Sequence, residues 1–162
     1  GVVNPSGKLP VTFPRSTGNI LSVYNHMPSH YFHPVVLEDP MPLYEFGYGL
    51  SYTSYEYTNL KAGEFVNGSL EVTVDVTNTG SRAGEEIVLL YMRDDYASMT
   101  RPVKELKGFT RVALEPGETK TAAFTVREDQ LAFFGKDGKW VTEPGTFTVM
   151  AGKLSASVTL KH

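Results

Sequence analysis

The clearest pattern of hydrophobic and polar residues lies between residues 70 and 94. Hydrophobic residues occupy every second position from Leu70 to Val76, and polar or charged residues lie between them. A period of two predicts an extended strand with one buried and one solvated face. The segment from Ile87 to Met92 is apolar at every position and therefore predicts a strand covered on both faces. Together the two strands indicate two packed layers.

Turn residues divide the chain beyond residue 54 into short segments. Asn67-Gly68 and Asp137-Gly138 are hairpin signals, and Pro116-Gly117 suits a type II turn. Gly108 marks an expected β-bulge. The segments between the turns predict strands at 55–60, 70–77, 87–92, 103–112, 119–126, 147–151 and 155–160, with a corner or one helical turn at 127–130. The short segments 133–134 and 140–141 flank the hairpin signal at Asp137-Gly138. We therefore predict an all-β fold, an immunoglobulin-like or fibronectin type III-like β-sandwich of seven or eight strands.

The first 53 residues are rich in proline and aromatic residues and predict mainly extended chain. Seven of the ten prolines fall in the first 42 residues and nearly exclude a helix there, because each removes a backbone donor. Residues 9–13 predict one short edge strand, and 19–42 a long extended connection rich in aromatic residues. Such a connection is expected to lie on another body of protein, because alone it would leave an apolar patch in water. We place the domain boundary between residues 53 and 54.

Composition narrows the classes of protein that are possible. The chain has 162 residues, of which 41% are hydrophobic and 20% charged, and a formal net charge of -3 without a basic cluster, so no nucleic-acid partner is expected. No apolar run reaches the roughly 20 residues of a membrane span. The absence of cysteine excludes disulfides and thiolate chemistry. The start at Gly1 has no features of a signal peptide, and we expect the chain to be a piece of a longer protein.

Two pairs of acidic residues are candidates for catalytic carboxylates. Asp94-Asp95 and Glu85-Glu86 are each adjacent in sequence, and neighbouring residues of a strand point to opposite faces. They cannot present the separation of about 5 Å, or about 6.5 to 9.5 Å, that glycosidases need. We interpret both pairs as solvated strand ends.

Three histidines, His26, His30 and His33, have a spacing that could hold a metal ion on a helix. Pro28 and Pro34 argue against that helix, so we expect no metal site. The sequence also lacks a nucleophile motif, a phosphate-binding loop and a dinucleotide-binding motif, so we expect neither a catalytic residue nor a cofactor.

Exposed aromatic residues could form a sugar-binding platform. Trp140 is the single tryptophan and lies beside the predicted Asp137-Gly138 hairpin, where a core or interface position is the commoner explanation. Trp140, Tyr96 and Phe134 are the candidate sugar contacts. The sequon formed by Asn67, Gly68 and Ser69 is explained equally well by the hairpin.

Several motifs carry a resemblance to a known family. Residues 4–14 (NPSGKLPVTFP) and 46–53 (FGYGLSYT) closely resemble the C-terminal region of the family three glycoside hydrolases, the β-glucosidase family. The fibronectin type III-like domain of that family is similar to residues 78–84 (NTGSRAG), Tyr91, 101–109 (RPVKELKGF), 114–119 (LEPGET) and 143–145 (EPG).

The resemblance implies that the chemistry lies elsewhere. Family members are retaining enzymes with an Asp nucleophile on a barrel domain and usually a Glu acid/base on the following α/β sandwich, and both would precede Gly1. It implies that residues 1–18 end the α/β sandwich, 19–53 form the connecting arm and 54–162 form the fibronectin type III-like domain. The segment 26–42 departs from the family pattern, so its path is not predicted.

The expected role is therefore accessory. The expected partners are the upstream catalytic domains of the same chain and, through them, an oligosaccharide or glycoside substrate, in the periplasm or outside the cell. Two alternatives stay open: a carbohydrate-binding module, and a domain for protein interaction or oligomerisation.

Overall fold

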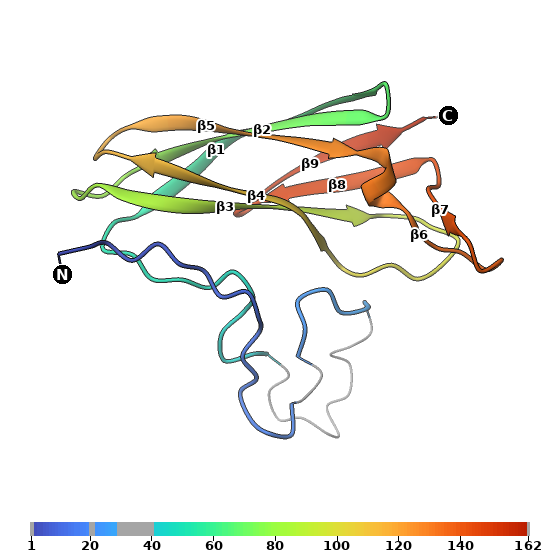
Figure 1. Cartoon of the computed structure of the whole chain (residues 1–162), viewed down its shortest axis with the longest axis horizontal. Coiled ribbons are helices and arrows are strands. Elements are labelled where there is room, and N and C mark those ends of the chain that lie inside the picture. The colour runs from blue at the N-terminus through green and yellow to red at the C-terminus, as the bar shows by residue number, and fades with distance from the viewer. Residues whose placement is uncertain (1, 20–21, 29–40, 162) are drawn as a thin grey trace.

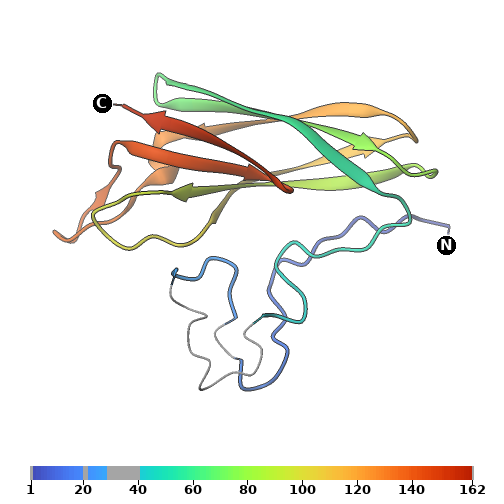
Figure 2. The ribbon, with the colours of Figure 1, turned by 180° about the vertical axis from the view of Figure 1, so that it is seen from behind.

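Two antiparallel sheets pack face to face in the computed structural model, which describes residues 2–19, 22–28 and 41–161. The first sheet has three strands in the order β1 (Tyr55–Val66), β2 (Ser69–Asn78) and β5 (Thr119–Arg127). The second has four in the order β4 (Glu105–Leu114), β3 (Gly84–Asp94), β8 (Gly145–Ala151) and β9 (Leu154–Leu160). Figure 1 shows these two layers, and Figure 2 shows them from behind.

A small hairpin stands apart from the two sheets. It consists of β6 (Phe133–Phe134) and β7 (Trp140–Val141) and follows a short 3-10 turn, η1 (Glu128–Leu131). The prediction of an all-β sandwich is confirmed, since seven strands build the two sheets. Among the described residues, no helix is long and apolar enough to cross a membrane.

The core forms where the inner faces of the sheets meet. The alternating residues of β2 behave as predicted: Leu70, Val72, Val74 and Val76 are fully buried, and Glu71 between them is exposed. On β3 the inward residues Val88, Leu90 and Met92 fill the core from the opposite side. Burial of such side chains contributes about 1.5–3 kcal/mol each, so this continuous core is the main source of stability.

The turns follow the predicted chemistry. Asn67 and Gly68 have φ angles of 50° and 74° between β1 and β2, and Gly117 has a φ of 77° in the turn before β5. The pairing of β3 with β4 shifts register where Leu90 faces Gly108 and Tyr91 faces Leu106, which confirms a bulge beside Gly108. These features let the strands stay paired while the chain turns tightly.

An extended arm, which comprises the described residues between 2 and 53, runs beneath the four-stranded sheet (Figures 1 and 2). The predicted edge strand at residues 9–13 is reduced to one β-bridge, between Phe13 and Tyr44. Hydrogen bonds extend this pairing: Leu9 N donates to Tyr48 O at 2.8 Å, and Phe13 N to Tyr44 O at 2.8 Å. The two ends of the arm thus support each other. Most of the segment 26–42 lies outside the described residues.

Candidate functional site

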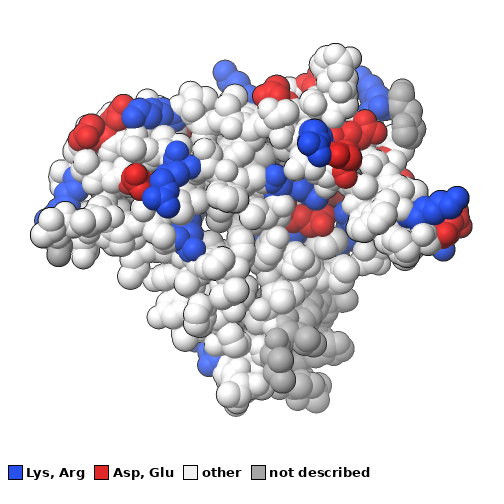
Figure 3. Space-filling view, in the orientation of Figure 1, with Lys and Arg blue, Asp and Glu red and all other residues white. Residues whose placement is uncertain are grey.

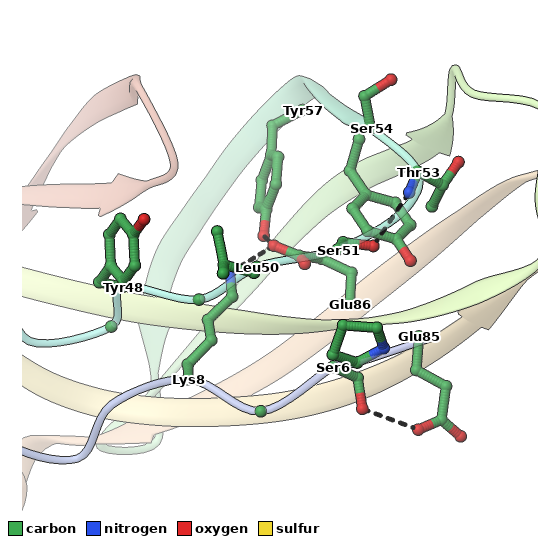
Figure 4. A pocket seen from close by; sticks show the side chains of 15 residues that line it. Ser6, Lys8, Tyr48, Leu50, Ser51, Thr53, Ser54, Tyr57, Glu85 and Glu86 are labelled. Atoms are coloured by element: carbon green, nitrogen blue, oxygen red, sulfur yellow. Dashed lines mark hydrogen bonds and ion pairs between the residues drawn. The ribbon is translucent and has the colours of Figure 1, made fainter. Parts of the chain in front are cut away.

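The most elaborate polar site of the described chain lies where the arm meets the sandwich. A cavity of about 400 Å³ opens there between arm residues 5–8 and 47–54 and the beginnings of β1 and β3 (Figure 4). Its lining is mixed, with hydroxyl groups, two carboxylates, one lysine and aromatic rings. The site therefore joins segments that are far apart in sequence.

Glu86 is the centre of this junction. Alternation along β3 turns its side chain inward, and the residue is only 9% exposed. Lys8 of the arm forms an ion pair with its Oε1, and the Tyr57 hydroxyl of β1 donates to the same oxygen at 2.7 Å, as Figure 4 shows. Burial, together with the Glu86 carboxylate, raises the pKa of Tyr57, so its hydroxyl stays a donor.

The sequence-based interpretation of Glu86 as a solvated strand end is wrong. Its partner Lys8 lies 78 positions earlier in the chain, so no local pattern could reveal the pair. Glu85 does point the other way, as predicted for an adjacent strand residue, and is half exposed. It accepts a hydrogen bond from Arg111 at 2.7 Å and one from Ser6 at 3.4 Å.

Two asparagines hold the junction together. Asn4 accepts hydrogen bonds from Ser51 Oγ at 3.1 Å and from Tyr52 N at 2.8 Å, and thereby ties the two arm segments. Asn78, at the end of β2, is fully buried, and its Oδ1 accepts from Thr53 Oγ1 at 2.7 Å and from Gly80 N at 3.1 Å.

The side-chain amide nitrogen of Asn78 makes two further hydrogen bonds. Nδ2 donates to Arg82 O at 2.8 Å and to Leu114 O at 3.1 Å. One buried side chain therefore bonds a side-chain hydroxyl at the arm end and backbone groups of the β2–β3 turn and β4, as a buried amide must. The sequence analysis did not predict this role of Asn78.

Aromatic side chains connect the arm to the outer face of β3. Tyr24 stacks on Phe46 with ring centroids 4.4 Å apart, and both contact Tyr91, at 5.9 and 6.4 Å. Burial raises the pKa of Tyr91 to about 12, with further contributions from Tyr24 and Glu45. The prediction that β3 is covered on both faces is thus confirmed, and the outer cover at Tyr91 is the arm itself.

The predicted sugar contacts lie at the opposite end of the sandwich. Phe134 and Trp140 face each other across the β6–β7 hairpin, with ring centroids 6.0 Å apart and ring planes at 75°. Trp140 is 72% exposed, so the alternative that it belongs to the core is wrong. Tyr96 is also exposed, on the loop after β3.

Asp94 and Asp95 are not solvated, contrary to the sequence-based interpretation. Their side chains are only 5% and 14% exposed, and Asp94 lies 3.7 Å from the Arg101 guanidinium. Burial raises the pKa of Asp94, and Arg101 opposes this effect. Asp95 accepts hydrogen bonds from Arg93 at 2.8 Å and from Thr148 at 3.0 Å. Both carboxylates fix the end of β3.

The histidine cluster cannot be assembled from the described residues. His26 Nδ1 lies 2.8 Å from the Met27 carbonyl oxygen, and the His26 carbonyl accepts from Val103 N at 3.0 Å. His30 and His33 lie outside the described residues. Within the described residues, no group of three His, Asp or Glu side chains is placed to hold a metal ion.

Comparison with known proteins assigns the family. Residues 1–52 match the C-terminal domain of glycosyl hydrolase family 3, and residues 86–155 match the fibronectin type III-like domain. The chain therefore belongs to the C-terminal region of the family three glycoside hydrolases. The resemblance found in the sequence motifs is confirmed.

Individual relatives agree with this assignment. The chain is 44% identical to a β-xylosidase of Formosa agariphila, over 99% of this chain and 23% of that protein. It is 42% identical to the periplasmic β-glucosidase of Salmonella typhimurium, over 98% of this chain and 22% of that protein. The solved β-glucosidase of Erythrobacter marinus superimposes with a TM-score of 0.91 at 43% identity, over 99% of this chain and 22% of that one. The chain thus spans less than a quarter of each of these relatives.

Proposed function

We propose that this chain is the accessory C-terminal part of a β-glucosidase-like glycoside hydrolase, and that it braces the catalytic domains without cleaving glycosidic bonds itself. The observation that supports this proposal is the large exposed apolar surface of the arm. Of the 18 large hydrophobic residues exposed in the described part of the chain, 12 lie on the arm. Exposed apolar surface of this extent is typical of an interface.

The exposed arm residues form a connected surface. Phe13 packs edge-on against Tyr44 at 6.4 Å, and Tyr44 packs against Tyr48 at 4.8 Å, yet all three rings are 40–46% exposed. Lys8, Arg15 and Glu45 are the charged residues of the described arm. Figure 3 shows the result: charged side chains gather over the sandwich, while the described residues of the lower part are almost all uncharged. We name Phe13, Tyr44, Tyr48 and Leu50 the arm face.

Membership of the family supports different roles for the two parts of this chain and for the upstream domains. Residues 1–53 are the end of the upstream α/β domain and its connecting arm, and residues 54–162 are the fibronectin type III-like domain. The upstream catalytic domains of the same chain are the partner of the arm face and supply the acid and nucleophile for a glycoside or oligosaccharide substrate. The name of the Salmonella relative supports a periplasmic or secreted location.

The test uses the complete enzyme that carries this chain. The double variant Phe13→Ser, Tyr44→Ser should lower the temperature at which aryl-β-glucosidase or aryl-β-xylosidase activity is lost. The matched control is Phe109→Ser, because Phe109 is an exposed aromatic residue of β4 and does not belong to the arm. The control should keep the parent's heat resistance.

Three outcomes would contradict the proposal. One is hydrolysis of an aryl glycoside by the 162-residue chain alone, above a buffer control. The second is equal heat resistance of the double variant and the parent enzyme. The third is a dimer of the complete enzyme in analytical ultracentrifugation that the double variant abolishes, since this would assign the arm face to a second copy.

A further inference from the structure

The hairpin β6–β7 presents two aromatic rings to solvent on the same face. Phe134 and Trp140 are directly opposed in the antiparallel register, and opposed residues lie on one side of a sheet. They are 58% and 72% exposed. Core packing therefore does not explain why aromatic residues occupy these two positions.

The hairpin is anchored from its other face. Alternation turns Phe133 inward, where it is 3% exposed, and the Arg101 guanidinium lies 4.6 Å from its ring centroid. At the turn, Gly135 N donates to Lys139 O at 2.8 Å, and Gly138 adopts a φ of 70°. The exposed pair is thus held on a fixed support, which lowers the entropy that binding would cost.

A third exposed aromatic residue, Tyr96, lies on a loop attached to the same end of the sandwich. Asp95 N donates to Thr146 O at 3.1 Å, and Ser98 N donates to Glu143 Oε2 at 2.8 Å. These bonds join the Tyr96 loop to the segment that directly follows Trp140. In Figure 1 the loop after β3 and the hairpin indeed lie at one end of the molecule.

We propose that Trp140, Phe134 and Tyr96 form a glycan-binding face that takes a pyranose polymer. A pyranose ring has faces of C–H groups that pack on a flat aromatic ring, and an edge of hydroxyls that needs polar neighbours. The hairpin supplies both, because the exposed residues Lys136, Asp137 and Lys139 lie in the turn that connects Phe134 to Trp140. The edge-on geometry of the two rings leaves Trp140 as the main stacking surface.

The size of the face favours a sugar over a protein partner. Aromatic side chains bury about 150–250 Å² each, so Phe134, Trp140 and Tyr96 together offer at most about 750 Å². A stable protein interface needs about 800 Å² from each partner. Three rings fall short of that area, but match one or two sugar units.

This inference is independent of the bracing role, because the arm face lies elsewhere. The test is native gel electrophoresis of the 162-residue chain through gels that contain soluble xylan, mixed-linkage β-glucan or hydroxyethylcellulose. At least one polysaccharide should retard the chain. Trp140→Ala should weaken this binding about tenfold or more, as truncation of a binding hot spot does. Phe109→Ala, the matched exposed control, should migrate like the parent.

Tryptophan fluorescence gives a second measurement. Trp140 is the single tryptophan, so the emission reports on this face alone. Titration with the retarding polysaccharide should shift the emission to shorter wavelength, and Tyr96→Ala should weaken the apparent affinity without unfolding the chain. The proposal is overturned if none of the three polysaccharides retards the chain, if Phe109→Ala loses retardation as Trp140→Ala does, or if Trp140→Ala abolishes a self-association seen in ultracentrifugation.

Discussion

Lys8 and Glu86, 78 positions apart in the sequence, form an ion pair at the point where the arm meets the sandwich. Their side chains are 21% and 12% exposed, so the pair is neither a surface bridge nor a fully buried one. Tyr57 donates to the same carboxylate oxygen from the other sheet. The arm, β3 and β1 are thus joined at one atom, which makes this pair the natural place to test whether the arm depends on the junction.

Glu86→Gln should destabilise the arm more than the sandwich. The change leaves the Lys8 ammonium without its anion in a half-buried place, and we expect a loss of about 1–3 kcal/mol in the free energy of unfolding, between the values for exposed and buried pairs. Urea denaturation provides the measurement, and hydrogen exchange at the Leu9 amide should speed up. A double-mutant cycle with Lys8→Met isolates the pair.

The matched control for this pair is Arg111→Met. Arg111 pairs with Glu85 one residue away on β3, but with side chains 58% and 43% exposed. Its loss should change the free energy of unfolding by less than about 1 kcal/mol. Equal effects of Glu86→Gln and Arg111→Met would contradict the importance of the Lys8 pair.

Gly47→Ala should loosen the contact between the arm and β3. Gly47 has a φ of 84°, and a Cβ there would lie 2.7 Å from Leu89 Cδ1. Backbone strain and the clash together should cost about 2–4 kcal/mol. Gly117→Ala is the control, because Gly117 has a similar φ of 77° but open space around it. Urea denaturation should show a larger loss in the free energy of unfolding for Gly47→Ala than for Gly117→Ala, and the difference measures the clash. Equal losses would argue against close packing of Gly47 on Leu89.

Asn78→Ala should be among the most damaging single changes in the sandwich. It removes four hydrogen bonds and leaves two carbonyl groups, the part-buried one of Arg82 and the buried one of Leu114, without this donor. We expect a loss of about 2–4 kcal/mol, measured by thermal or urea unfolding. Thr53→Val removes one of these bonds at similar volume and should cost about 1 kcal/mol. If both variants lose the same amount, Asn78 does not act as the hub of this network.

The strands could be predicted from sequence because their signal is local. The alternation from Leu70 to Val76 and the turn at Asn67-Gly68 depend on neighbours within a few residues, and both appear in the structure as predicted. The same local logic failed at Glu86 and Asp94. Their partners, Lys8 and Arg101, lie in other segments, so burial through tertiary contacts overrode the expectation that strand-end carboxylates are solvated.

The junction was harder to predict for a related reason. The apolar outer face of β3 predicts that other residues cover it, and the aromatic arm predicts that the arm packs on protein. No sequence pattern predicts that the arm packs on β3 itself, through Tyr24, Phe46 and Tyr91. Exposure of Trp140 was equally invisible, because a tryptophan beside a hairpin is more often packed. Pairings between distant segments are seen only in the folded structure.

Tyr91→Phe should make the alkaline loss of stability less steep. The pKa of Tyr91 is about 12 in the folded chain, above its ordinary value of 10.0, because burial disfavours the phenolate. The stabilisation is fully present below pH 10 and is lost as the pH rises through about 12, since the unfolded chain releases this proton first. The free energy of unfolding then falls by at most about 1.4 kcal/mol per pH unit, and solvent screening reduces that figure.

Urea denaturation between pH 9 and 11.5 measures this slope. Phenylalanine keeps the ring contacts with Tyr24 and Phe46 but cannot ionise, so the slope should become shallower, although Tyr57, whose pKa is also raised, keeps part of it. The same slope in the parent and in Tyr91→Phe would mean that the arm does not shield Tyr91 from water, and would therefore count against the arm as the outer cover of β3.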